Sequence, residues 1–133
     1  MSVRARKTKG SSIVETAAGL ILLIPIVLFL VDVAAMVVAQ TENDKLAKAC
    51  ARAAAEFPSS NSGGQNTAAM GVYNNQKRSN LLTPTAFNLS ASGGLVTCNT
   101  TITCTLPVPV PFLGNSSVAF NARATEPIVG ELP

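Results

Sequence analysis

The chain lacks histidine and tryptophan and is poor in charge. Only 13% of its 133 residues are Asp, Glu, Lys or Arg, and 5% are aromatic. Without histidine, metal sites and general base catalysis lose their most frequent side chain. The serines have no base partner other than lysine, and no glycine-rich phosphate loop follows an expected strand. We therefore expect no enzymatic activity, no metal, no cofactor and no small-molecule substrate.

Positive charge is concentrated at the N-terminus. The first ten residues hold no acid and four cations, which are Arg4, Arg6, Lys7 and Lys9. The net charge of the whole chain is +3, so it is −1 when these four are left out. By the positive-inside rule, such a leader stays in the cytoplasm. The basic leader is therefore a topology signal, of a kind that any single-pass membrane protein can carry, and we expect no nucleic-acid binding.

A long apolar segment follows the leader. From Ile13 to Ala39 it is interrupted only by Glu15, Thr16 and Asp32. About 20 apolar residues in a helix cover the roughly 30 Å of a bilayer core. The segment is too long for a cleaved secretory signal and has no small-residue exit site. We predict a transmembrane helix over residues 11–39, with the C-terminal part of the chain translocated.

The two acids of this helix lie towards its opposite ends. A charge in hydrocarbon costs several kcal/mol unless it is paired or reaches water. For Asp32 we favour a side chain that reaches the outer interface, an intramembrane or interfacial acid without a further role. For Glu15 we favour a function. Cleavage after Gly10 would place the new amine of Ser11 one helical turn away, and an amine and a carboxylate offset each other's desolvation in lipid.

Helix-forming residues continue beyond the apolar segment. No breaker separates the apolar span from residues 40–57, and Pro58 follows as a stop, so we predict one continuous rod with an outer half at residues 40–57. Residues 58–85 are predicted to hold a turn-rich linker and a short second helix from Asn66 to about Ser79. An apolar stripe at helical spacing is expected to face the soluble domain; it consists of Leu46, Cys50, Ala53 and Phe57. Inward positions of the second helix are Ala69, Val72 and Tyr73.

Residues 86–133 show the period-two pattern of a small antiparallel β-sheet. In the stretch 95–106 the apolar side is formed by Val96, Cys98, Thr100, Ile102, Cys104 and Leu106. We interpret this stretch as a hairpin with its turn at Thr101, which sets Cys98 opposite Cys104. A translocated hairpin favours a disulfide between these two residues, with Cys50 free and buried. Three prolines at 107, 109 and 111 are expected at a sheet edge. Alternation resumes over 118–124, which predicts a last strand.

These segments predict an α+β protein: a leader (1–10), a membrane helix (11–39), its continuation (40–57), a linker with a second helix (58–85) and a small antiparallel sheet (86–133). Asn-x-Ser/Thr patterns occur at Asn88, Asn99 and Asn115, which a chain rich in these residue types produces by chance.

One motif joins the leader to the span. Gly10 is followed by four residues and then Glu15, which is the layout of a type IV prepilin processing site. With the basic leader, the acid at Asp32 and the alanine-rich run over 47–55 that contains Arg52, the chain resembles the TadE-like minor pilins, or pseudopilins, of the tight-adherence (type IVc) pilus system.

The resemblance implies a pilin-like fold and a prepilin in the bacterial inner membrane, with its N-terminus cytoplasmic and its C-terminal domain periplasmic or extracellular. It implies cleavage between Gly10 and Ser11 by a prepilin peptidase. Its partners would be other pilins and the pilus assembly machinery, in adhesion, biofilm formation or secretion. The alternative is an uncleaved membrane-anchored periplasmic binding or sensory module. A membrane-tethered thiol enzyme would need an exposed Cys50 with a lowered pKa, against which the helical stripe argues.

Overall fold

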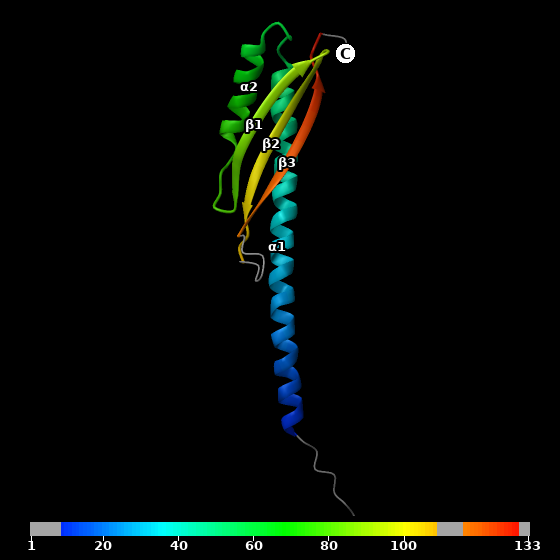
Figure 1. The fold of residues 1–133 in the computed structure, drawn as a ribbon, viewed down its shortest axis with the longest axis vertical. Helices are drawn as coiled ribbons and strands as arrows, with labels where there is room; N and C mark the ends of the chain where they lie inside the picture. The colour runs from blue at the N-terminus through cyan, green and yellow to red at the C-terminus, as the bar shows by residue number, and fades with distance from the viewer. Residues whose placement is uncertain (1–8, 109–115, 131–133) are drawn as a thin grey trace, which may run out of the picture.

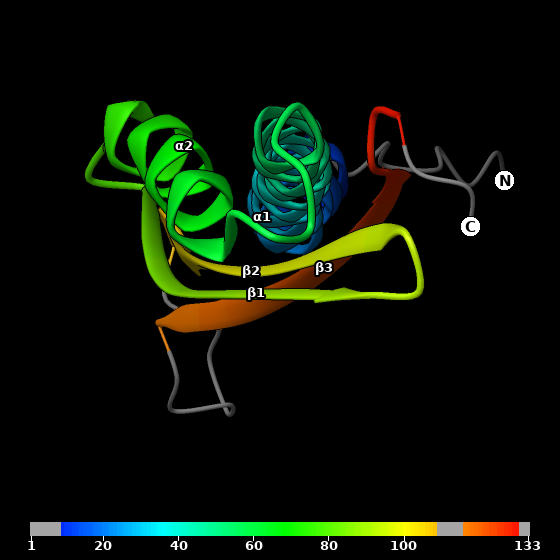
Figure 2. The same cartoon turned by 90° about the horizontal axis from the view of Figure 1, so that it is seen from above.

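The computed structural model describes residues 9–108 and 116–130. Two helices, α1 (Lys9–Ala55) and α2 (Ser62–Asn75), precede three strands, β1 (Leu82–Ser92), β2 (Leu95–Thr105) and β3 (Ser117–Pro127). The strands form one antiparallel sheet in the order β1-β2-β3. Both helices lie on the same face of this sheet (Figure 2), so the fold has two layers. The predicted α+β class, with a long apolar N-terminal helix and a small antiparallel sheet, is confirmed.

Helix α1 is much longer than the rest of the molecule (Figure 1). It runs unbroken through Pro25, which confirms the predicted continuous rod. We call its part from Ser12 to Val38 the stalk. The remainder of α1, from Ala39 onward, packs with α2 and the three strands, and we call this unit the head. Only 6% of the apolar window in the helix is buried, and the helix is long and apolar enough to cross a membrane.

The core of the head lies where α1 packs against the sheet. The buried face of α1 follows helical spacing and consists of Leu46, Ala47, Cys50, Ala51 and Ala54. Two members of the predicted stripe, Leu46 and Cys50, lie on this face, whereas Ala53 and Phe57 are only half-buried. Helix α2 adds the buried Ala69. Alanines on both helices allow the two layers to approach closely at little cost in side-chain entropy.

Strand β2 is central and is not a hairpin. It runs straight through Thr101, and each of its residues pairs with β3, from Leu95 with Pro127 to Thr105 with Ser117. The turn lies at Gly93 and Gly94, whose φ angles of 58° and 70° suit the two-residue turn that joins twisted antiparallel strands. The predicted faces are nevertheless correct, since the even positions from Val96 to Leu106 are all buried.

Other boundaries also differ from prediction. The sheet begins at Leu82 and not at 86, with Pro84 beside a bulge in the edge strand β1, where a missing N–H is tolerated. Helix α2 begins four residues earlier than predicted, because the Asn61 side chain accepts a hydrogen bond from Gly64 N and caps it. A Cβ at Gly64 would lie 2.9 Å from the Phe57 ring, so glycine fits this approach. Residues 109 and 111 lie outside the described residues.

Candidate functional site

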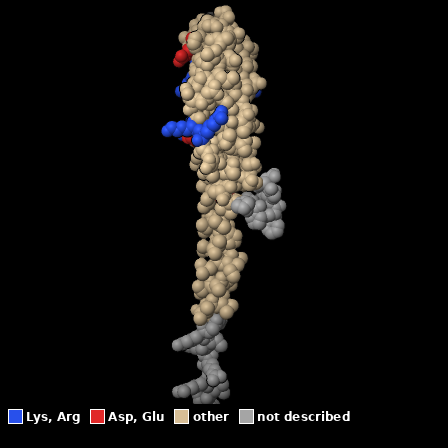
Figure 3. Space-filling model, turned by 90° about the vertical axis from the view of Figure 1, so that its left-hand side faces the viewer, with Lys and Arg blue, Asp and Glu red and all other residues tan. Residues whose placement is uncertain are grey.

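The stalk presents bare apolar surface. Most of its large apolar side chains are 40–72% exposed, from Ile13 at one end to Val38 at the other, whereas Val33 and Met36 are half-buried. No blue or red atoms interrupt the lower half of the rod on the face seen in Figure 3. Such a surface is too large to remain in water. By length and composition, the stalk is therefore a candidate membrane span.

The residues of the predicted processing site lie at the N-terminal end of this helix. Lys9, Gly10 and Ser11 have helical backbone, while Arg4, Arg6 and Lys7 lie outside the described residues. Glu15 is exposed on the stalk. The hydroxyl of the neighbouring Thr16 donates to Ser12 O within the helix, at 2.9 Å. The amine that cleavage would create, and its pairing with Glu15, remain predictions.

Asp32 differs from its predicted setting. It is only 2% exposed, although the sequence predicts an acid that reaches the interface. Its Oδ1 accepts a hydrogen bond from Val108 N at 3.2 Å. Val108 follows the end of β2, where its N–H has no strand to pair with, and a carboxylate is a strong acceptor for such a donor. Asp32, near the C-terminal end of the stalk, therefore holds the segment that follows β2 against α1.

The hydrogen bond between Val108 N and Asp32 can be tested by hydrogen exchange at this one amide. Asp32→Leu is expected to speed hydrogen exchange of the Val108 N–H by about tenfold or more, because a hydrogen bond to a charged group contributes about 1.5–3 kcal/mol. Asp32→Asn keeps an acceptor oxygen and should retain most of the protection. Exchange followed by NMR in detergent micelles measures both variants. Equal exchange in the wild type and Asp32→Leu would show that the carboxylate does not hold this segment.

A polar cluster that the sequence did not predict joins the helix to the sheet. Asn43 is 0% exposed and Thr100 is 1% exposed. The Asn43 amide donates to Phe120 O at 2.6 Å and to Thr100 O at 3.3 Å. Its Oδ1 accepts from Thr100 Oγ1 at 2.7 Å. Both the nitrogen and the oxygen of the Asn43 side-chain amide are thus engaged with β2 and β3. One feature of the sequence could have indicated this cluster: Thr100 is the one polar residue on the apolar side of β2.

The predicted disulfide is wrong. Cys98 and Cys104 lie on the same strand, six residues apart, which separates their Cα atoms by about 20 Å at 3.3–3.4 Å per residue. A disulfide needs Cα atoms closer than about 7 Å. Cys50, Cys98 and Cys104 are all free and buried, so the expectation of a buried Cys50 is met. Cys104 lies near the foot of the head, with Sγ 3.9 Å from Ala35 O.

Cys50 of α1 and Cys98 of β2 belong to the same buried cluster between the helix and the sheet. A hydrogen bond from the Cys98 thiol lowers the pKa of Cys50. The same bond and burial raise the pKa of Cys98. Sequence patterns could not predict that these two residues share a cluster, because it depends on the tertiary packing of α1 on the sheet.

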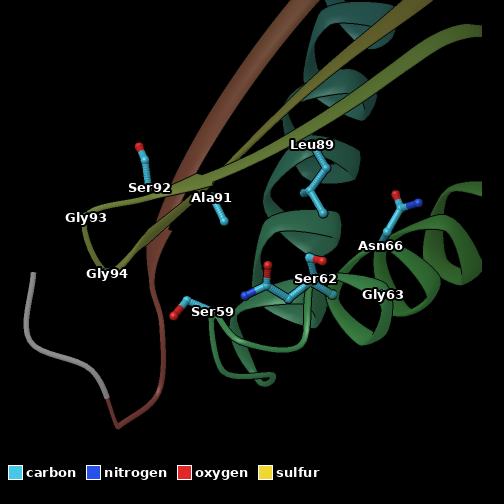
Figure 4. A pocket seen from close by; sticks show the side chains of 10 residues that line it. Ser59, Ser62, Gly63, Asn66, Leu89, Ala91, Ser92, Gly93 and Gly94 are labelled. Carbon is cyan, nitrogen blue, oxygen red and sulfur yellow. The ribbon is translucent and has the colours of Figure 1, made fainter.

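A polar hollow of about 600 Å³ lies near the far tip of the head. It is bounded by the start of α2 and the β1–β2 turn, as Figure 4 shows with Ser62, Asn66 and Gly93. The described residues that line it include no ionisable side chain. Within residues 9–108 and 116–130, no group of three or more His, Cys, Asp or Glu is placed to hold a metal ion. The hollow thus offers polar contacts without an acid, a base or a nucleophile activated by one.

No family model, curated protein or solved structure matches this chain.

Proposed function

We propose that this chain is a TadE-like minor pilin or pseudopilin of a tight-adherence (type IVc) pilus. The observation that carries the proposal is the shape of α1. One helix of 47 residues is bare and apolar along its N-terminal part and forms the core of a small head at its C-terminal part. A subunit of this form can rest in a bilayer through its stalk and can later pack the same surface against other apolar helices.

The motif at the start of α1 supports a particular orientation of this helix in the membrane. Gly10 and Glu15 stand at the start of α1, after a leader with four cations. In the proposal, a prepilin peptidase cuts between Gly10 and Ser11 on the cytoplasmic side, and the trimmed subunit enters a pilus or its assembly machine. The head then lies in the periplasm or outside the cell, where it contributes to adhesion, biofilm formation or secretion.

The alternative is an anchored periplasmic binding or sensory module. The polar hollow beside α2 favours this alternative, since a binding module needs such a recess. The two functions differ in the fate of the leader, which a pilin loses and an anchor keeps.

Processing is tested at Gly10. In cells that contain the peptidase, the mature chain is expected to begin at Ser11, and Gly10→Val is expected to retain the leader because a branched Cβ blocks close approach to the backbone. N-terminal sequencing of the membrane-bound protein measures both. Gly19→Val is the matched control, since a Cβ at Gly19 meets nothing within 4 Å, and it should be cut as the wild type is. A mature wild-type chain that still starts at Met1 or Ser2 would contradict the pilin proposal.

A further inference from the structure

An apolar groove lies where the stalk meets the head. It has a volume of about 260 Å³ and lies between the last turns of the stalk and the segment that leads into β1. The connection from α2 to β1 is at the end of the head nearest the stalk (Figure 1). Apolar side chains from both sides line the groove, and they include Ala34 and Val38 of α1, Leu81 of the connection and Leu82 of β1. Val38 and Leu81 are 53% and 45% exposed, so the groove is open at its mouth.

The wall of the groove is formed in advance and offers little to a polar ligand. Among the described residues that line it, Ser79 carries the one hydroxyl, and its Oγ already accepts a hydrogen bond from Leu82 N at 3.0 Å. Leu82 O accepts from Ser79 N at 3.1 Å, and Leu81 O accepts from Thr105 N at 2.8 Å. These bonds fix the segment that forms the wall. A polar group buried without a partner costs free energy, so the groove suits an apolar occupant.

The position of the groove along α1 relates it to the candidate membrane span. From Ile13 to Ala34 the helix rises by about 32 Å at 1.5 Å per residue. The hydrocarbon core of a bilayer is roughly 30 Å thick. If the stalk spans a bilayer from Ile13 onward, the groove therefore opens where the acyl chains of the leaflet on the side of the head meet their headgroups. Its volume is below the about 300–1,000 Å³ of usual small-molecule pockets, so it suits part of one chain.

Positive charge lies beside the groove in the sequence. Lys77 and Arg78 directly precede Ser79, and both are exposed. Neither takes part in a salt bridge with a described residue. Cations close to a bilayer surface attract anionic lipids. An apolar groove and two available cations thus occur together at the level expected for lipid headgroups.

We propose that the groove and the two cations form a binding site for one anionic phospholipid of the leaflet on the side of the head. One acyl chain enters the groove between Ala34 and Leu82, and the phosphate group meets Lys77 and Arg78. An apolar side chain of a second subunit would also fill the groove. The adjacent cations favour the phospholipid, because it carries an anion next to an apolar chain. The site requires only a membrane span, which the pilin proposal and the anchored-module alternative share, so its failure would not decide between them.

The test uses the full chain in phosphatidylcholine vesicles that contain a small share of a photoactivatable lipid. The probe is either phosphatidylglycerol or phosphatidylcholine, each with a diazirine in one acyl chain. Irradiation, digestion and mass spectrometry then locate the labelled residues. Both probes should label the stalk. The phosphatidylglycerol probe should label residues 79–82 about tenfold more than the phosphatidylcholine probe does, because two cations near the surface favour the anionic lipid.

Two variants with matched controls separate the groove from the charge. Ala34→Phe fills the groove from an exposed position and should remove the label from residues 79–82, while Ala18→Phe, the same change at an exposed position of the stalk, should keep it. Lys77→Gln/Arg78→Gln should remove the preference for phosphatidylglycerol, while Lys48→Gln/Arg123→Gln, at two other exposed cations of the head, should retain it.

Three results would overturn the proposal. These are equal labelling of residues 79–82 by the two probes, labelling that persists in Ala34→Phe, and a preference for phosphatidylglycerol that persists in Lys77→Gln/Arg78→Gln. Label confined to the stalk in every sample would also overturn it and would favour a side chain of a second subunit as the occupant.

Discussion

Asn43→Leu is expected to lower the free energy of unfolding of the head by about 3–5 kcal/mol, the largest effect on stability that we expect from a single substitution. The variant removes the donor to the part-buried Phe120 O and the closest acceptor of the buried Thr100 hydroxyl, which is left with the backbone Asn43 O at 3.4 Å. Each buried polar group left without a partner costs about 1–3 kcal/mol, and the larger side chain must also fit a closely packed interface. For a head of this size, such a loss is a large part of the total stability.

The measurement uses the buried cysteines of the reduced protein. Since Cys50, Cys98 and Cys104 are all buried, their rate of alkylation in increasing urea reports the opening of the head, without interference from the helical signal of the stalk. Asn88→Leu, at an exposed position of β1, is the control and should unfold as the wild type does. The double variant Asn43→Leu/Thr100→Val should cost less than the sum of its two single variants, because it removes both side chains of one hydrogen bond. Additive losses would show that the two side chains act independently.

Glu15→Gln is expected to reduce recovery of the subunit in sheared or co-purified pilus material by at least tenfold, while its amount in the membrane fraction stays unchanged. Glutamine keeps the shape and removes the charge. The amine of Ser11, from the same or a neighbouring subunit, would then lie unmatched in a poorly hydrated site, at a cost of about 3–5 kcal/mol. The effect should be confined to assembly, because Glu15 lies on the stalk, far along α1 from the core of the head (Figure 1).

Glu42→Gln is the matched control for this experiment. It makes the same chemical change in the same helix, but Glu42 is part of the head and pairs with Lys45 on the surface, at 2.8 Å. Exposed pairs of this kind contribute little to stability. Recovery of Glu42→Gln in the pilus fraction should therefore match the wild type. If Glu15→Gln were also recovered like the wild type, the acid would have no part in assembly and the anchored-module alternative would gain support.

Local patterns in the sequence predicted the faces of the elements better than their boundaries. Alternation along 95–106 identifies the buried side of β2 correctly, because side chains of a strand alternate whether or not the strand turns. The same alternation cannot locate a turn. Thr101 is β-branched and fits an extended strand, whereas Gly93 and Gly94 can adopt the positive φ angles that the tight turn requires. The hairpin at Thr101 was wrong because it had no turn residue.

Contacts between distant segments were beyond the sequence alone. The burial of Cys50 followed from its place on the helical face, but its neighbour Cys98 is set by how α1 lies across the sheet. Asp32 was predicted to lie at the interface because the sequence shows its position along the apolar helix. The sequence does not show that the chain returns to this helix at Val108 and covers the carboxylate. Asn43 has neighbours of mixed character, so its burial is explained only by the partners that the sheet supplies.

The unbroken course of α1 has a mechanical consequence. Within the described residues, α1 passes from stalk to head without a break, so the helix itself provides no hinge about which the head could tilt or swivel. A pull along the stalk is transmitted straight into the helix–sheet interface, where it acts as shear on the layer that contains Asn43 and on the tie between Asp32 and Val108. Under tension, sliding of α1 along the sheet would thus be resisted first by these polar contacts.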